Sequence, residues 1–92
     1  ELEGARILRA ETVRRMTEVA TPKGMSEKRA LGWDIDTTYS RPRGGFPVGE
    51  SYGHTGFTGC CVWLDPAEQA FFVLLSNRLH ETDPQTDSRE LY

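Results

Sequence analysis

The chain has 92 residues and a formal net charge of −3, with 11 Lys and Arg spread among 14 Asp and Glu. A chain of this size is one small domain or a piece of a larger one, and it buries only about 60 to 65% of its unfolded surface. Its charges form no basic stripe, which argues against a nucleic-acid partner. No apolar run approaches the roughly 18 residues of a membrane span.

The first residues, Glu-Leu-Glu-Gly, have neither the basic flank nor the apolar stretch of a signal peptide. They also lack a starting Met, which favours a fragment of a longer protein, although a trimmed tag or maturation explains it equally well. We find no internal repeat.

The two cysteines, Cys60 and Cys61, are adjacent and so cannot link distant segments as the disulfides of small secreted domains do. Neighbours in a strand point to opposite faces, and we interpret the pair as two buried, reduced thiols rather than a vicinal disulfide or a reactive pair. Reduced thiols favour the cytoplasm weakly, and nothing else in the sequence indicates a compartment.

The first regular element is predicted to be a helix at about 10–19. Val13, Met16 and Ala20 recur there at helical spacing. The segment 21–24, Thr-Pro-Lys-Gly, ends the helix, because Pro and Gly both interrupt helical geometry.

A strand is predicted next, at about 30–36. Leu31, Trp33 and Ile35 alternate with Gly and Asp, which is the period of a half-buried strand, and we expect Trp33 in the core. The following loop, 37–53, is too rich in Pro and Gly for regular structure.

An antiparallel hairpin is predicted at about 56–77, with a turn at 65–69 that opens with Asp-Pro. Its second arm, 70–77, is apolar on both faces, so we expect a central strand covered by helices on each side. One short helix cannot cover two faces, so part of the fold is missing or comes from another chain. Residues 1–80 then form the folded segment, and 81–92 form a polar tail.

A motif at 49–53, Gly-Glu-Ser-Tyr-Gly, matches the G-x-S-x-G nucleophile elbow letter for letter. An elbow requires a buried strand before the Ser and a helix after it. Here a Pro- and Gly-rich loop precedes Ser51 and a Gly-rich strand follows, so we interpret Ser51 as a loop hydroxyl.

A second motif, His54-Thr55-Gly56, places a titratable side chain and a hydroxyl at the entrance to the predicted strand. Its glycines would let a substrate approach the backbone. An acyl group lying along this edge would meet a backbone N–H and a proton or hydrogen bond from His54. Composition alone favours the plainer alternative, a twisted strand with a surface His.

The two histidines, His54 and His80, are widely separated, and no Cys or carboxylate stands at ligand spacing from them. The sequence therefore predicts no metal site and no cofactor, and His80 is interpreted as a loop residue.

Three segments in this order and spacing resemble the serine β-lactamase-like and penicillin-binding-protein-like family. They are LGWDID at 31–36, GHTGFTG at 53–59 and FVLLSNR at 72–78. The resemblance covers about 7–80 and is closest to the class C and esterase-like branch, where His-Thr-Gly stands in place of Lys-Thr-Gly.

The resemblance implies an α/β fold of the α+β sandwich type with an antiparallel sheet, of which this chain is the C-terminal helix-and-strand segment. By the same resemblance, His54 assists proton transfer or anchors the substrate, and Thr55 holds the substrate's polar group. Gly56 keeps the strand open, and the backbone N–H of Phe57 forms half of an oxyanion hole.

The family's nucleophile motif, Ser-x-x-Lys, is absent from these 92 residues, because Ser26 is followed by Lys28 at the wrong distance. The Tyr-x-Asn form of the second motif is absent as well, at both Tyr39 and Tyr52. We expect no intact active site here. The parent protein would be a hydrolase acting through an acyl-Ser intermediate on an ester, an amide or a β-lactam.

Two alternatives remain open at this stage. In the first, the chain is a non-catalytic fragment or binding module whose sheet edge pairs with a second chain. In the second, it is one part of a split enzyme. The residues do not decide between these alternatives, nor do they give the substrate or the oligomeric state.

Overall fold

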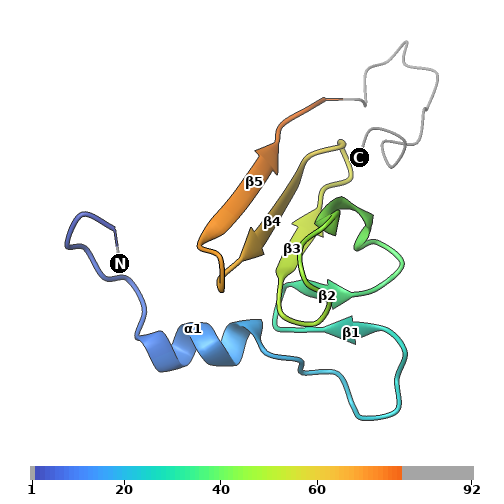
Figure 1. Cartoon of the computed structure of the whole chain (residues 1–92), viewed down its shortest axis with the longest axis horizontal. Coiled ribbons are helices and arrows are strands. Elements are labelled where there is room, and N and C mark those ends of the chain that lie inside the picture. The colour runs from blue at the N-terminus through green and yellow to red at the C-terminus, as the bar shows by residue number, and fades with distance from the viewer. Residues whose placement is uncertain (1, 78–92) are drawn as a thin grey trace.

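A computed structural model describes residues 2–77 as one helix and a five-stranded antiparallel sheet (Figure 1). The predicted fold class, a helix with antiparallel strands of α+β type, is confirmed. The strands follow one another in the order β1-β2-β3-β4-β5. The elements are α1 (Ala10–Thr17), β1 (Lys28–Arg29), β2 (Asp34–Asp36), the 3-10 helix η1 (Arg41–Arg43), β3 (Tyr52–Thr55), β4 (Cys61–Asp65) and β5 (Ala70–Leu74).

The hairpin of β4 and β5 is the most regular part of the sheet, with Cys61 opposite Leu74 and Asp65 opposite Ala70. A turn closed by the Gln69 amide, which donates to the Pro66 carbonyl at 3.2 Å, joins the two strands. The first arm was predicted to begin at about 56. It begins at Cys61, because the residues before it form a separate turn.

The core is built around Trp63, whose side chain is fully buried. Its partner across the strand pair is Gly53 on β3, and a Cβ at Gly53 would overlap the Trp63 ring and the Val62 carbonyl. Ile35 and Cys61 are also buried. The missing side chain of Gly53 therefore provides the space that the indole fills.

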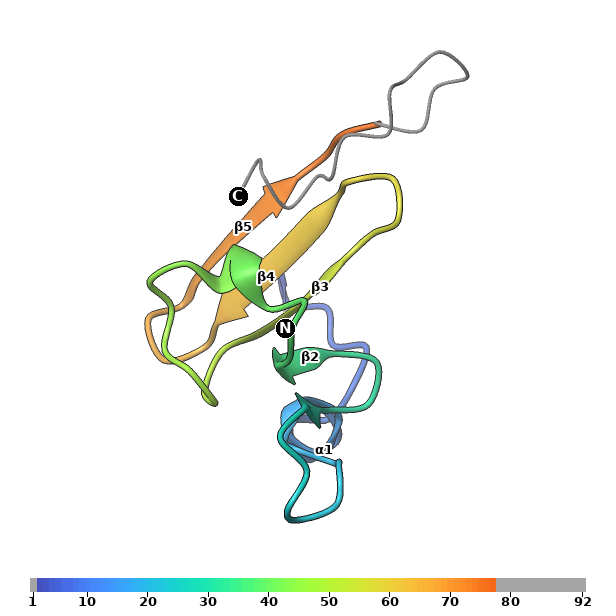
Figure 2. The ribbon, with the colours of Figure 1, turned by 90° about the vertical axis from the view of Figure 1, so that its right-hand side faces the viewer.

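The loop between β2 and β3 covers this core. Its single 3-10 turn, η1, contacts β3 and β4, and Pro42 within it is buried. The Phe46 ring lies 6.4 Å from that of Phe72 on β5. Figure 2 shows the loop lying over the face of β4. It ends at Ser51, slightly earlier than predicted, because Tyr52 begins β3.

The strand β5 lies at the edge of the described sheet, so the expectation of a central strand covered on both sides by helices is wrong for the described residues. Alternate side chains face opposite ways, and only one row is covered by the loop. Phe71 and Val73 in the other row are 69% and 51% exposed. The helix α1 lies beside β1 at the other end of the sheet and buries no residue (Figure 2).

Only Asp34–Asp36 of the predicted strand 30–36 is extended, because Gly32 has a φ of 81° and turns the chain. Leu31 is consequently 57% exposed. Trp33 is half-buried instead of lying in the core, and its ring meets that of Tyr52 edge-on at 5.1 Å.

The predicted polar tail, 81–92, lies outside the described residues, as does His80. Within the described part of the chain, no helix is long and apolar enough to cross a membrane.

Replacing Gly53 by Ala is expected to destabilise the protein by about 1–3 kcal/mol, because the new Cβ overlaps the buried Trp63 ring. Chemical denaturation measures the change. Gly45→Ala is the matched control, since a Cβ at that position meets no atom within 4 Å. Equal stability of the two variants would contradict the close packing of Trp63 on Gly53.

Candidate functional site

The His-Thr-Gly motif was expected at the entrance to the first strand of the hairpin. It lies instead at the end of the preceding strand, β3. His54 pairs with Val62 and Thr55 pairs with Cys61 on β4. Successive side chains on a strand face opposite ways. His54 therefore lies on the open face of the sheet and is exposed, whereas Thr55 is half-buried on the face covered by the loop.

A tight turn follows the motif and carries Phe57. The Gly56 amide donates to the Cys60 carbonyl at 2.6 Å, and the Gly59 amide donates to the Gly56 carbonyl at 3.0 Å. Phe57 is 82% exposed, and no described residue accepts a hydrogen bond from its amide. The turn thus presents a backbone donor beside the motif.

The side of β3 that faces β2 is largely unpaired. Gly53 opposite Asp34 is the only register pair between the two strands. Beyond that pair, no strand of the described region lies against His54 and Thr55 on this side. The backbone after Gly53 therefore has an edge at which an extended ligand can add.

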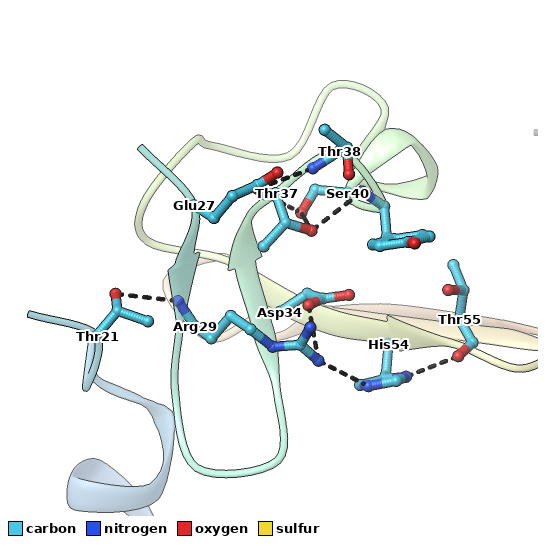
Figure 3. Close-up of polar contacts among 10 residues, drawn as sticks. Thr21, Glu27, Arg29, Asp34, Thr37, Thr38, Ser40, His54 and Thr55 are labelled. Carbon is cyan, nitrogen blue, oxygen red and sulfur yellow. Dashed lines mark hydrogen bonds and ion pairs between the residues drawn. The ribbon is translucent and has the colours of Figure 1, made fainter. Parts of the chain in front are cut away.

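Arg29 reaches His54 from β1, the strand on the far side of β2 (Figure 3). Its Nη2 atom lies 3.2 Å from His54 Nε2 and 3.2 Å from Asp34 Oδ1. The other ring nitrogen, His54 Nδ1, lies 2.6 Å from the Thr55 carbonyl oxygen. Three adjacent strands therefore contribute one chain of polar contacts.

Asp34 is the buried member of this chain, with 1% of its surface exposed. Its Oδ1 atom accepts no hydrogen bond from any residue in the described region, so the ion pair with Arg29 balances its charge. A buried carboxylate without a cationic partner is strongly unfavourable. The Arg29 guanidinium is therefore drawn to Asp34, and this position brings it to His54.

The backbone of Arg29 is also fixed. Its carbonyl accepts hydrogen bonds from the Ala20 and Thr21 amides at 2.7 and 3.3 Å, and its amide donates to Thr21 Oγ1 at 3.4 Å. The register of β1 on β2 shifts between Lys28 and Arg29, which places Arg29 opposite Asp34. Such irregularities redirect side chains.

Sequence reasoning missed both Arg29 and Asp34. Arg29 lies in a short charged run without alternation, so no local pattern predicts a strand there. Asp34 alternates with apolar residues, which predicts an exposed carboxylate, yet the turn at Gly32 and the pairing with β3 bury it. A charged residue directly before Ile35 was the only signal available.

The two cysteines differ in their surroundings. Cys61 is buried, whereas Cys60 is half-buried and lies just before β4, so the expectation of two buried thiols within a strand holds for Cys61 alone. Cys60 Sγ lies 3.1 Å from the Ser76 carbonyl, and the Ser76 amide lies 3.4 Å from the same sulfur. These contacts fasten the turn that carries Phe57 to the segment after β5.

Ser51, interpreted from the sequence as a loop hydroxyl, lies at the end of the loop before β3 and is fully buried. Its Oγ accepts a hydrogen bond from Trp63 Nε1 at 2.9 Å and donates to the Pro47 carbonyl at 2.7 Å. The neighbouring Tyr52 hydroxyl is a poor candidate for a base, because burial raises its pKa.

Ser51→Ala is expected to lower the free energy of unfolding by about 1–3 kcal/mol, because the buried Trp63 N–H loses its acceptor. Thermal unfolding measures the loss, with the exposed Ser26→Ala as control. Unchanged stability of the Ser51 variant would contradict the structural role of this hydroxyl.

No group of three or more His, Cys, Asp or Glu side chains within residues 2–77 is arranged to hold a metal ion. His80, the second histidine of the chain, lies beyond this region.

Comparison with known proteins identifies the family. The family profile described as Beta-lactamase matches residues 1–91. A protein of Escherichia coli K12 named "Putative D-alanyl-D-alanine carboxypeptidase" is 34% identical over 83 residues, and one of the same name from Escherichia coli O157:H7 is 35% identical over 80. These alignments cover 86% and 83% of this chain.

The chain spans only 18% of the length of each of these two relatives. No solved structure matches it. The match along almost the whole sequence shows that this chain belongs to the serine β-lactamase-like family.

Proposed function

We propose that this chain forms one wall of the active site of a serine hydrolase of β-lactamase, D,D-peptidase or esterase type. Catalysis would proceed through an acyl-Ser intermediate, in which a serine oxygen attacks the substrate carbonyl, the amine or alcohol leaves with a proton, and water then releases the acid. The chain would be the C-terminal portion of the catalytic domain and would supply the His-Thr-Gly strand.

The open edge of β3 carries this proposal. The chain after Gly53 has no strand partner on the side of β2 among the described residues, and the Phe57 amide has no acceptor there. An acyl group added along this edge would place its carbonyl oxygen near that amide. The amide would then stabilise the oxyanion that develops in the transition state.

The neighbouring residues have distinct proposed roles. His54, on the open face, anchors the substrate or assists proton transfer. Thr55 holds the substrate's polar group, and Gly56 keeps the backbone accessible because it has no side chain. The nucleophile would come from a Ser-x-x-Lys motif outside these 92 residues, since none occurs within them.

The relatives' name points to peptides ending in D-alanyl-D-alanine as the substrate class. The resemblance of the His-Thr-Gly motif to the esterase-like branch favours small esters as a second class. β-Lactams are cyclic amides with the same reacting carbonyl, so all three classes pose the same requirement for an oxyanion donor.

His54→Ala is expected to lower kcat/KM by about 100-fold, because the variant loses the hydrogen-bonding ring at the substrate edge. A chromogenic ester, a chromogenic cephalosporin and a D-alanyl-D-alanine peptide are the substrates to compare, using the protein as its gene encodes it. His80→Ala is the matched control for loss of an imidazole. Full activity in the His54 variant would show that His54 does not contribute to the active site.

Gly56→Ala separates a catalytic from a structural role of the motif. A Cβ at Gly56 would lie 3.4 Å from the Cys60 carbonyl oxygen, an ordinary contact, so stability should change little. We expect kcat/KM to fall about tenfold, because the methyl group narrows the approach to the backbone. A loss of stability equal to that of Gly53→Ala, with activity retained, would contradict the proposed role.

A partner-binding role is the second candidate, and the exposed apolar row on β5 favours it. Phe71 and Val73 on β5, and Leu75 directly after it, are 69%, 51% and 79% exposed. Intact mass and turnover measured on one sample separate the two candidates. A mass well above 10.4 kDa with turnover supports the hydrolase, whereas a 10.4 kDa species without turnover supports the binding module. Turnover by that small species would overturn the claim that the nucleophile lies elsewhere.

A further inference from the structure

We infer that Arg29 is a positioning residue that helps to hold the proton of the His54 ring on Nδ1. Its importance for catalysis rests on the proposed function, but the state of the ring can be tested without it. The inference follows from the partners of the two ring nitrogens. The partner of Nε2 can only donate hydrogen bonds, and the partner of Nδ1 can only accept them.

The partner of Nδ1 is a backbone carbonyl. The distance from His54 Nδ1 to the Thr55 oxygen is 2.6 Å, and a carbonyl oxygen can only accept a hydrogen bond. Nδ1 must therefore carry the proton. The acceptor belongs to the next residue of the same strand, so this contact is maintained wherever β3 keeps its conformation.

The partner of Nε2 is a guanidinium. Arg29 Nη2 lies 3.2 Å away and has no acceptor capacity, since guanidinium nitrogens only donate. Nε2 must therefore present its lone pair and carry no proton. A doubly protonated ring would set an N–H and a positive charge against the guanidinium.

Both contacts require the same neutral tautomer. Arg29 cannot easily move away, because its side chain pairs with the buried carboxylate of Asp34 at 3.2 Å and its backbone is bonded to Ala20 and Thr21. The charged groups facing the ring are thus Arg29 on β1 and Asp34 on β2 (Figure 3), while its partner on β4, Val62, is uncharged.

This arrangement assigns the ring a role that the sequence left open. With Nδ1 bonded to Thr55 and Nε2 bonded to Arg29, His54 has no proton to give from its outer nitrogen. His54 therefore does not donate a proton to the substrate, Arg29 fixes the orientation of its ring, and the fixed positive charge beside the open edge of β3 belongs to Arg29.

Nitrogen-15 NMR of the imidazole ring tests the inference on the protein as its gene encodes it. His80→Gln leaves His54 as the only histidine within the present sequence, and work at pH about 8 lies above the usual titration range of histidine. Nε2, recognised by its couplings to both carbon-bound ring protons, should resonate as unprotonated. A ring protonated on Nε2 would overturn the inference.

Arg29→Met removes the donor while keeping much of the side-chain length. The His54 ring then keeps only the Thr55 carbonyl as a restraint, so part of the population should exchange to the Nε2-protonated form that the guanidinium excludes, and kcat/KM should fall about tenfold. Arg43→Met is the control for loss of an ion pair, since it removes the 3.1 Å contact between η1 and Asp36 on β2 without touching His54. The control variant should change neither the tautomer of His54 nor kcat/KM.

Arg29→Lys keeps a cationic donor and should retain more of the Nδ1-protonated ring than Arg29→Met. Equal shifts in the two variants would assign the effect to packing and overturn the positioning role, as would a ring unaffected by either. The expected tautomer in a protein without hydrolase activity would instead refute the proposed function and leave the state of the ring established.

Discussion

The fit of Trp63 against Gly53 is the contact on which the rest of the structure depends. The indole is fully buried, and a Cβ at Gly53 would overlap it. This contact fixes β3 on β4. The indole N–H donates a hydrogen bond to Ser51 at the end of the covering loop, so the loop is also fastened to Trp63. A small domain with a marginal core thus concentrates its packing on one aromatic side chain.

The candidate site lies directly beside that contact. Gly53 is the last residue of β3 that pairs with β2, and His54 is the next residue along the strand. Close packing therefore ends where the open edge begins. The buried charge of Asp34 on β2 draws in Arg29, which in turn contacts His54. The core and the site are consequently coupled through residues adjacent in sequence, so variants at Gly53 must be judged by both stability and activity.

The apolar row on β5 has a different significance. Three of its five apolar residues are half-buried on the side of the loop, and the other two, Phe71 and Val73, are exposed at an edge of the described sheet. A large exposed apolar surface is uncommon on a monomeric protein and marks an interface. It agrees with a chain that spans 18% of its relatives' length, in which other elements or another chain would cover this face.

The sequence by itself determined the helix near 10–19, the hairpin near 56–77, the antiparallel α+β class and the family, because each depends on local periodicity or on motifs in a fixed order. The residues around Ser51 also argued against an elbow nucleophile there. Only the tertiary structure decided that Asp34 is buried, that β5 is at the edge of the described sheet and that Arg29 meets His54. These facts depend on strand register and on a turn with positive φ at Gly32, which bring together residues that no local pattern connects.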